Sequence, residues 1–449
     1  MKLFKVKEKL EKKQIKKRGT KKEYKNNINS KRNNLKIIGI TGSRGKSTTA
    51  LMIHNYLKFL GYKSTLYSSV MVDSPASHLK KNEAYEVAVR DEESLISIIE
   101  EVEAYGADYL VLEVNESSLE KGFLRDVPFD VRVLTNLNPK HNLEQYPEEE
   151  YVELKKSFFK DIADDCKCVF GFQDYSKELL DELLQLNSYP KFVCSSNYIA
   201  TLKGLEKDKV KCLLTGLDND ISGMKLRFNL NDDTYKMETT LMMSHNALNI
   251  LVALTALDVM DVLNVRKFEQ ALNQLVIPGR SEVYRVNGRL IIIDSHLPAM
   301  LDCLKHLKGQ GKVNKVKVVV GSMGYGYKHW EDRFKTKEFA LQRKDVRKFA
   351  MSLLPGVADY VYLTESDSGK ENTNDICKEL EANLEGLIPS SIILDREEAI
   401  KQAILDSEEG DAVFISGRGN RKVLCNSETT FKLVKDSEVV EKVVKELGW

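Results

Sequence analysis

The chain has 449 residues, of which 42% are hydrophobic and 30% are charged, and this is the composition of a globular protein. Its 68 Lys and Arg residues almost balance its 67 Asp and Glu residues, but residues 1–35 alone hold 14 of the basic residues and only three glutamates. The rest of the chain is therefore mildly acidic, which argues against a general nucleic-acid-binding surface.

The basic segment 1–35 is expected to be a flexible tail. It either stays solvated or contacts an anionic membrane or polymer, because Leu3, Val6 and Leu10 have helical spacing among lysines. It lacks the apolar core of a secretory signal. Seven scattered cysteines without a CxxC pair predict free thiols. These features predict a cytoplasmic protein.

From residue 36 the sequence alternates between apolar runs and helical stretches. Residues 36–40 predict a buried strand, and residues 47–60 predict a helix that ends at Gly61. The segments predicted after them are strands at 109–114 and 131–137, a small β-rich part at about 190–240, and a helix at 246–260.

A second alternating series follows the Pro-Gly-Arg run at 278–280, and we place a domain boundary near Ile277. The strand–helix–strand order predicts an α/β protein with mainly parallel sheets. We expect a P-loop central domain over 36–277 and a Rossmann-like C-terminal domain over 278–449. The strands predicted in the second series are 289–293, 316–320, 360–363 and 412–415.

The strongest motif is the run GITGSRGKSTT at 39–49, between the first predicted strand and the first predicted helix. Glycines let the backbone wrap around phosphate oxygens, while the loop N–H groups and the helix N-terminus supply positive potential. Lys46 is expected to reach the β- and γ-phosphates, and the Ser47 hydroxyl to bind Mg²⁺. The residues predicted to contact nucleotide here are Gly42, Ser43, Arg44, Gly45, Lys46, Ser47 and Thr48.

With glycines at 39, 42 and 45, this GxxGxxGK(S/T)TT form resembles the Mur ligase superfamily more than kinases or GTPases. Further blocks in the family's order support the resemblance, which is greatest to the ligases that add the third amino acid to the UDP-N-acetylmuramoyl dipeptide. These blocks are LEV (112–114), FDV and TNL (129–137), His141, YVELK (151–155), PGRSE (278–282), DSHLP (294–298), DREEAI (395–400) and GRG (417–419).

The resemblance implies an ATP-dependent amide-forming ligase. In this family the γ-phosphate passes to a carboxylate, and an amine then displaces phosphate from the acyl phosphate. Cations are needed because negative charge crowds the transferring phosphoryl group. The resemblance therefore implies ATP, two Mg²⁺ ions, an amino acid acceptor and a carboxylate-bearing peptide or peptidoglycan-type precursor.

Site residues follow from the resemblance by position. Lys46, His141 and Lys155 are the expected catalytic residues, and Ser47, Glu113, His141 and Lys155 are the expected metal site. Lys155 matches a lysine that CO₂ converts to a carbamate. Because Lys156 adjoins it, the plainer alternative is a lysine on a solvated helix face. The remaining residues expected to contact nucleotide are Asn246, Asn249, Arg280 and Asp294.

Several positions depart from the family pattern, and they bear on substrate contacts more than on nucleotide contacts. Lys140 replaces an Asp before the expected metal-site His141, and Met243 replaces a Gly before the spaced-Asn helix. Asn-Glu-Ser at 115–117 replaces Ser-Ser-His, and His296 aligns only with a gap.

The acceptor region also differs. Ser-Asp-Ser-Gly at 366–369 stands where diaminopimelate-adding enzymes carry Asp-Asn-Pro-Arg, and Arg421 replaces a Glu. Arg binds carboxylates through paired hydrogen bonds. This predicts an acceptor other than diaminopimelate, with an acidic side chain; the alternative is an exposed arginine without a specific partner.

The three-domain cell-wall ligases have an N-terminal domain that binds the UDP sugar, and the 35 residues before the phosphate loop are too few to build it. We therefore expect donor recognition that does not use uridine in the usual way. Two alternatives stay open beside the leading hypothesis: a poly-γ-glutamate-type synthetase, and a nucleotide-binding switch or scaffold that has lost ligase chemistry.

Overall fold

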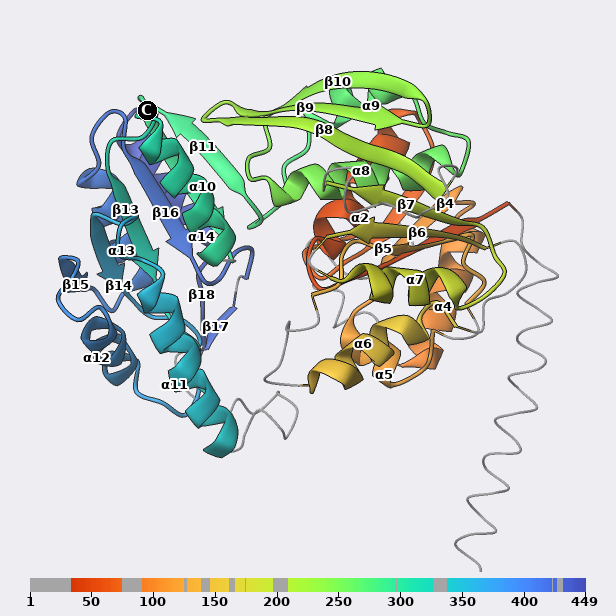
Figure 1. Ribbon diagram of the computed structural model, residues 1–449. Helices are drawn as coiled ribbons and strands as arrows, with labels where there is room; N and C mark the ends of the chain where they lie inside the picture. The colour runs from red at the N-terminus through yellow and green to blue at the C-terminus, as the bar shows by residue number, and fades with distance from the viewer. Residues whose placement is uncertain are drawn as a thin grey trace, which may run out of the picture.

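The computed structural model describes most of the chain from Asn34 onward (Figure 1). Residues 1–33 of the basic tail, Lys140, His141 and His296 therefore lie outside the described residues. The described ranges are 34–74, 91–124, 127–138, 146–160, 166–173, 175–196, 209–295, 297–325, 337–421, 423–425 and 431–449.

The first part of the chain folds around a ten-stranded sheet with the order β10-β9-β8-β7-β6-β5-β1-β4-β2-β3. Its centre is parallel, with β1 between β4 and β5, as a series of strand–helix–strand units requires. The strands from β1 to β7 are β1 (Lys36–Thr41), β2 (Ser64–Tyr67), β3 (Val72–Asp73), β4 (Tyr109–Glu113), β5 (Val131–Leu134), β6 (Lys167–Phe172) and β7 (Lys191–Ser195).

The predicted β-rich part at about 190–240 is confirmed, and it extends this same sheet. β8 (Val210–Asp220) pairs in parallel with β7. β9 (Gly223–Leu230) and β10 (Asp233–Thr239) then continue as an antiparallel meander. The apolar side chains of this meander join the core beneath it rather than forming one of their own.

Helices cover both faces of the large sheet (Figure 1). On one face α8 is buried on nearly all sides, which is typical of a helix hydrophobic all round. That face carries α2 (Lys46–Phe59), α8 (His245–Asp258) and α9 (Val265–Leu272), and the other carries α4 (Glu92–Ala104), α5 (Glu116–Glu120), α6 (Glu148–Ser157) and α7 (Lys177–Gln185).

The second part of the chain has a six-stranded sheet with the order β11-β12-β16-β13-β14-β15, parallel except for β11. It confirms the predicted second α/β unit, while the boundary near Ile277 stays a prediction. Its strands are β11 (Glu282–Val286), β12 (Arg289–Asp294), β13 (Val316–Val320), β14 (Tyr360–Leu363), β15 (Ser390–Ile392) and β16 (Ala412–Ser416).

Two layers of helices enclose this smaller sheet, and a short hairpin lies beside it (Figure 1). α10 (Leu297–Gly309), α11 (Lys337–Ser352) and α12 (Thr373–Asn383) contribute to the core on one face. α13 (Arg396–Leu405) and α14 (Asp436–Glu446) contribute to the core on the other. The hairpin is β17 (Val423–Cys425) with β18 (Phe431–Leu433).

The two parts of the chain meet through buried side chains. Met242 and Met243 precede α8 but pack in the core of the six-stranded sheet. Met243 has φ 76°, the left-handed region in which the glycine of the family pattern would be at ease. Asn420, which follows β16, donates from Nδ2 to the Val70 carbonyl at 2.7 Å.

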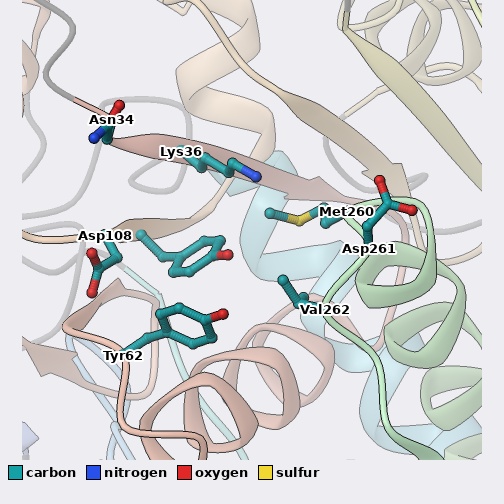
Figure 2. Close-up of a pocket in the computed structure, with 8 residues that line it drawn as sticks. Asn34, Lys36, Tyr62, Asp108, Met260, Asp261 and Val262 are labelled. Atoms are coloured by element: carbon teal, nitrogen blue, oxygen red, sulfur yellow. The ribbon is translucent and has the colours of Figure 1, made fainter.

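Two further observations limit where function resides. A pocket lies at the amino-terminal edge of the parallel strands, between Lys36 and Asp108 (Figure 2). It is at the opposite end of β1 from the phosphate loop, so it is not part of the same site. Among the described helices, none combines the length and the apolar character needed to cross a bilayer.

Candidate active site

The phosphate loop follows the carboxyl end of β1, where open α/β sheets bind ligands. Gly42 and Gly45 have φ values of 147° and 78°. A Cβ at Gly42 would lie 2.0 Å from Thr135 Oγ1, and one at Gly45 would lie 2.0 Å from Asn249 Oδ1. The loop thus needs both glycines, for backbone conformation and for space.

The residues after β5 hold this loop in shape. Ser43 N donates to the Asn136 carbonyl at 3.1 Å, and Arg44 N donates to Asn136 Oδ1 at 3.0 Å. Thr135 Oγ1 donates to the Arg44 carbonyl at 2.5 Å. Because these residues turn toward the loop, β5 ends at Leu134, three residues before the predicted end.

Lys46 begins α2 and bends back over the loop. Its Nζ donates to the Gly42 carbonyl at 2.9 Å and lies 3.6 Å from Glu116 Oε1. This places a cation at the mouth of the loop, the position from which a lysine neutralises nucleotide phosphates.

Three oxygen-bearing side chains form a second cluster beside the loop. Ser47 Oγ lies 3.0 Å from Ser69 Oγ, and Ser69 donates to Glu113 from its Oγ at 3.2 Å and from its N at 2.8 Å. Glu113 is buried at the end of β4. Magnesium prefers hard oxygen ligands, so Ser47 and Glu113 fit such an ion.

Lys155 is fully buried, so the alternative of a solvated helix face is wrong for this residue. Its Nζ lies 2.7 Å from Glu116 Oε1 and donates to Thr41 Oγ1 at 3.1 Å. Burial lowers the pKa of Lys155 to about 8, although Glu116 opposes the shift. The neighbouring Lys156 instead pairs with Glu153 at 2.9 Å.

Glu116 joins the two lysines of the site. Burial acts to raise the pKa of Glu116, but the charges of Lys46 and Lys155 hold it well below its usual range. Tyr151 donates from its hydroxyl to Glu116 Oε1 at 3.3 Å and to Ser43 Oγ at 3.0 Å. Lys46 and Lys155, separated by 109 positions in the sequence, therefore share one carboxylate.

The spaced asparagines of α8 reach the loop from the other side. Asn249 packs over Gly45 and donates from Nδ2 to Asn246 Oδ1 at 3.1 Å. His245 begins the same helix, and burial followed by the charges of Arg44 and Arg280 lowers its pKa to about 4. The positive charges of both arginines therefore disfavour a further positive charge on His245 at the start of α8.

Arg280 and Asp294 lie where the second part of the chain begins. Arg280 donates from Nη1 to the Ser295 hydroxyl. Asp294 Oδ2, at the end of β12, accepts from Ser281 N at 2.7 Å. Asn246 Nδ2 donates to the Ser281 hydroxyl at 3.5 Å. Ser281 thus links Asp294, at the end of β12, to the asparagines of α8.

The expected acceptor region lies at the carboxyl ends of β14 and β16. Arg418 donates to Asp367 Oδ1 at 2.9 Å, and Arg421 donates to Asp367 Oδ2 at 3.2 Å. Arg418 is buried, whereas the Arg421 side chain is 50% exposed. Within the described residues, the hydroxyls of Ser366 and Ser368 are buried without a hydrogen-bond partner.

One expected metal ligand, His141, falls outside the described residues. Within them, no cluster of three His, Cys, Asp or Glu side chains is placed to hold a metal ion. The sequence analysis missed Ser69, Tyr151 and the role of Glu116. The signal for Glu116 was present, because a carboxylate stands where the family has a neutral side chain.

The glycine at 45 gives a direct test of the loop. Gly45→Ala is expected to weaken ATP binding about tenfold or more, because the new Cβ must displace Asn249 or strain the left-handed backbone. Gly61→Ala is the matched control, with φ 91° and nothing within 4 Å of its Cβ. Titration with a fluorescent ATP analogue compares the two, and equal affinities would contradict the geometry.

Comparison with known proteins decides the family. The model for the Mur ligase middle domain matches residues 40–257, and the model for the Mur ligase glutamate ligase domain matches residues 279–419. The chain belongs to the Mur ligase family. Members of this family are ATP-dependent, ADP-forming ligases that require magnesium, and this chain is an amide-forming ligase of that kind.

Individual relatives agree with this assignment. The UDP-N-acetylmuramoyl-L-alanyl-D-glutamate–2,6-diaminopimelate ligase of Geobacillus kaustophilus is 28% identical over 427 residues, 92% of this chain and 80% of the relative. A MurF ligase from Thermotoga maritima solved with ADP shares the fold, with TM-score 0.62, 19% identity and coverage of 95% and 83%. Folylpolyglutamate synthase from the same organism gives TM-score 0.61, 17% identity and coverage of 88% and 89%.

Proposed function

We propose that this Mur ligase joins an amino acid to the carboxylate of a peptide or peptidoglycan-type precursor through an acyl phosphate. The observation that carries the proposal is the convergence of Lys46, Lys155 and the Ser47–Glu113 oxygen cluster around one phosphate loop. The Geobacillus relative, a ligase named for muramyl-dipeptide and diaminopimelate substrates, supports this substrate class.

Within this proposal, Lys46 neutralises the phosphates, and catalysis is chiefly positioning and charge stabilisation. Ser47 would hold the magnesium that accompanies the nucleotide, and Glu113 and His141, with the carboxylated Lys155, would help to hold a second ion. Magnesium at this position supplies the charge that draws electrons from the transferring phosphoryl group. Nucleotide contacts come also from Asn246, Asn249, Arg280 and Asp294, of which Asn249 packs over Gly45 of the loop and bonds to Asn246.

Lys155 is proposed to carry a carboxylate added by CO₂. Support comes from its complete burial beside the phosphate loop, where an ammonium group would repel a divalent cation. Carboxylation turns that cation into an anion suited to magnesium.

The basic tail is proposed to contact an anionic membrane or polymer. Its charge supports this, because 14 Lys and Arg residues lie in the first 35 positions. Removing residues 1–33 should weaken sedimentation with anionic vesicles while leaving the rate of ligation unchanged. Vesicle binding that does not change would contradict the tail's role.

The proposed acceptor is an amino acid with an acidic side chain. Arg421 is half exposed beside Asp367, and the unpartnered Ser366 and Ser368 hydroxyls lie in the same loop as Asp367. We expect Arg421→Glu to raise KM for an acidic acceptor about tenfold or more. The side-chain carboxylate of the acceptor would then face a second carboxylate instead of the guanidinium that donates hydrogen bonds to it. An amino-acid panel measures this, and equal use of diaminopimelate by the unchanged protein would contradict it.

Coupled phosphate release tests the function as a whole. A ligase releases phosphate quickly only when the acid donor and the amine acceptor are both present. A nucleotide switch would hydrolyse ATP slowly without either, and the relatives, which are named ligases, do not favour that alternative. Nor do they favour a poly-γ-glutamate-type synthetase over a muramyl-peptide ligase. Phosphate release independent of both substrates would reject the proposal.

A further inference from the structure

A fully buried arginine on α11 lies beside the expected acceptor region. Arg347 donates from Nη1 and Nη2 to the two carboxylate oxygens of Glu371 at 2.8 and 2.9 Å. It also donates to Glu379 Oε2 at 2.9 Å and to the Met323 carbonyl at 2.9 Å. A guanidinium that makes paired hydrogen bonds fixes the direction of its partner as well as the distance to it.

Two of these partners lie in different segments of the chain, one after β13 (321–325) and one after β14 (366–371). Gly324 N, in the first segment, donates to the Asp367 carbonyl of the second at 2.7 Å. A Cβ at Gly324 would lie 1.9 Å from the Ser368 carbonyl oxygen, so the two backbones pack without room between them. The buried arginine therefore holds, from α11, two segments that already meet.

The same two segments hold the Arg421 guanidinium. Arg421 Nη1 lies 3.3 Å from Met323 Sδ and donates to Asp367 Oδ2 at 3.2 Å. Because the Arg421 side chain is half exposed, its direction depends on where Met323 and Asp367 are placed. Arg347 binds the backbone of Met323 and the segment that contains Asp367, so it acts on both.

A purely structural role would not explain this set of contacts. An arginine that only joined α11 to α12 would need Glu379 alone, because Glu379 lies on α12. The two helices already pack through the apolar core of the smaller sheet, to which Met351 and Leu380 contribute. A buried ion pair is seldom the most stable way to join two helices. The bonds of Arg347 to Glu371 and to the Met323 carbonyl instead fit a role in placing the acceptor region.

We propose that Arg347 is a positioning residue for the amino acid acceptor. By holding the Met323 carbonyl and the Glu371 carboxylate, it sets the direction of the Arg421 guanidinium and thereby the affinity for the acceptor. This inference rests on the proposed function, in which Arg421 binds the acceptor. Within the described residues, the hydrogen bonds of Arg347 do not reach the phosphate loop, so nucleotide affinity is expected to stay unchanged.

The test measures by isothermal titration calorimetry how tightly the full-length protein binds three probes: L-aspartate, L-glutamate and diaminopimelate. Magnesium and a non-hydrolysable ATP analogue are present throughout. Arg347→Lys keeps the charge but loses the paired hydrogen bonds, so it is expected to weaken binding of the preferred probe about tenfold. The affinity for the ATP analogue, titrated separately, is expected to stay within about twofold of its value in the unchanged protein.

A second substitution shows whether Arg347 acts through Arg421. Arg421→Ala removes the group that Arg347 is proposed to position. Adding Arg347→Lys to Arg421→Ala is therefore expected to change the affinity for the preferred probe by less than about twofold. An equal loss from Arg347→Lys in both backgrounds would overturn the route through Arg421.

Two further variants separate positioning from folding. Arg289→Lys makes the same exchange at an arginine that donates to the Ser407 carbonyl at 3.0 Å. Arg289 begins β12, at the opposite end of the parallel strands from the acceptor region, so this variant is expected to bind the probes as the unchanged protein does. Glu371→Gln weakens the pair from the other side and is expected to reproduce the loss. It decides the matter if circular dichroism shows that Arg347→Lys does not fold.

The possible results distinguish this inference from the proposal beneath it. Unchanged probe affinity in Arg347→Lys and Glu371→Gln would overturn the positioning role and leave the ligase function intact. Affinities for the probe and the ATP analogue that fall together would also overturn it, because they would show a general loss of structure. Binding of none of the three probes by the unchanged protein would reject the proposed acceptor, and this inference with it.

Discussion

Replacing Lys46 with alanine is expected to lower the rate of ligation by about 10³-fold, because one preorganised cation at a transferring phosphoryl group contributes on this scale. The Lys46 ammonium is fixed by the Gly42 carbonyl at 2.9 Å, so it needs little reorganisation to meet a phosphate. Its removal also leaves Glu116 with Lys155 as its only lysine partner near the loop in the described structure. ADP formation with both substrates present measures the loss.

A lysine elsewhere on the same helix provides the control for this variant. Lys58 lies in the last turn of α2 and pairs with Asp73 at 2.6 Å, away from the phosphate loop. Lys58→Ala is expected to leave the rate within about twofold, since exposed ion pairs contribute little. Comparable rates for the Lys46 and Lys58 variants would show that the loop does not hold the reacting phosphates.

Replacing Arg396 with methionine is expected to lower the free energy of unfolding by about 3–5 kcal/mol, because it leaves a buried carboxylate without its partner. Arg396 and Asp436 are both buried. Arg396 donates to the two oxygens of Asp436 at 2.7 and 2.8 Å, and also to the Ser416 carbonyl at 2.9 Å. The pair ties α13 to α14 across the core they share.

Two controls apply to this second prediction, measured by urea unfolding followed by circular dichroism. Adding Asp436→Asn to Arg396→Met is expected to recover part of the loss, because the uncompensated charge is then removed. Lys401 and Glu446 form an exposed pair between the same two helices at 4.0 Å. Lys401→Met should cost less than about 1 kcal/mol. Equal costs for Arg396→Met and Lys401→Met would contradict the argument from burial.

Much of the fold follows from local patterns in the sequence. The strand at 36–40, the helix that ends before Gly61 and the strands of the second series all lie within a few residues of their predicted positions. The position of the β-rich part was harder to predict from the sequence. It depends on the pairing of β8 with β7, and the residues of the β-rich part do not determine that pairing alone. Its sequence predicts strands but does not specify their neighbour.

Some residues of the candidate site could also be predicted from the sequence, whereas others depend on how the helices pack. The phosphate loop is evident because glycines and a lysine at fixed spacing are needed together. The sequence cannot tell whether Lys155 or Lys156 faces the core, since both lie in one polar stretch and the answer depends on how α6 packs. Tyr151 stands four residues before Lys155 on the same buried face, and this helical spacing is the one local signal.

The packing of Met242 and Met243 has a consequence for protein engineering. Consider a chimaera that joins the six-stranded sheet of this chain to the ATP-binding part of another relative. If the chains are joined at residue 277, the transplanted core loses the Met242 and Met243 side chains and is left with cavities in their place. A cut before Met242 would keep both methionines but would take α8 and α9 out of the core of the ten-stranded sheet, so no single cut there preserves both hydrophobic interiors. Exchangeable modules in this protein therefore overlap in sequence.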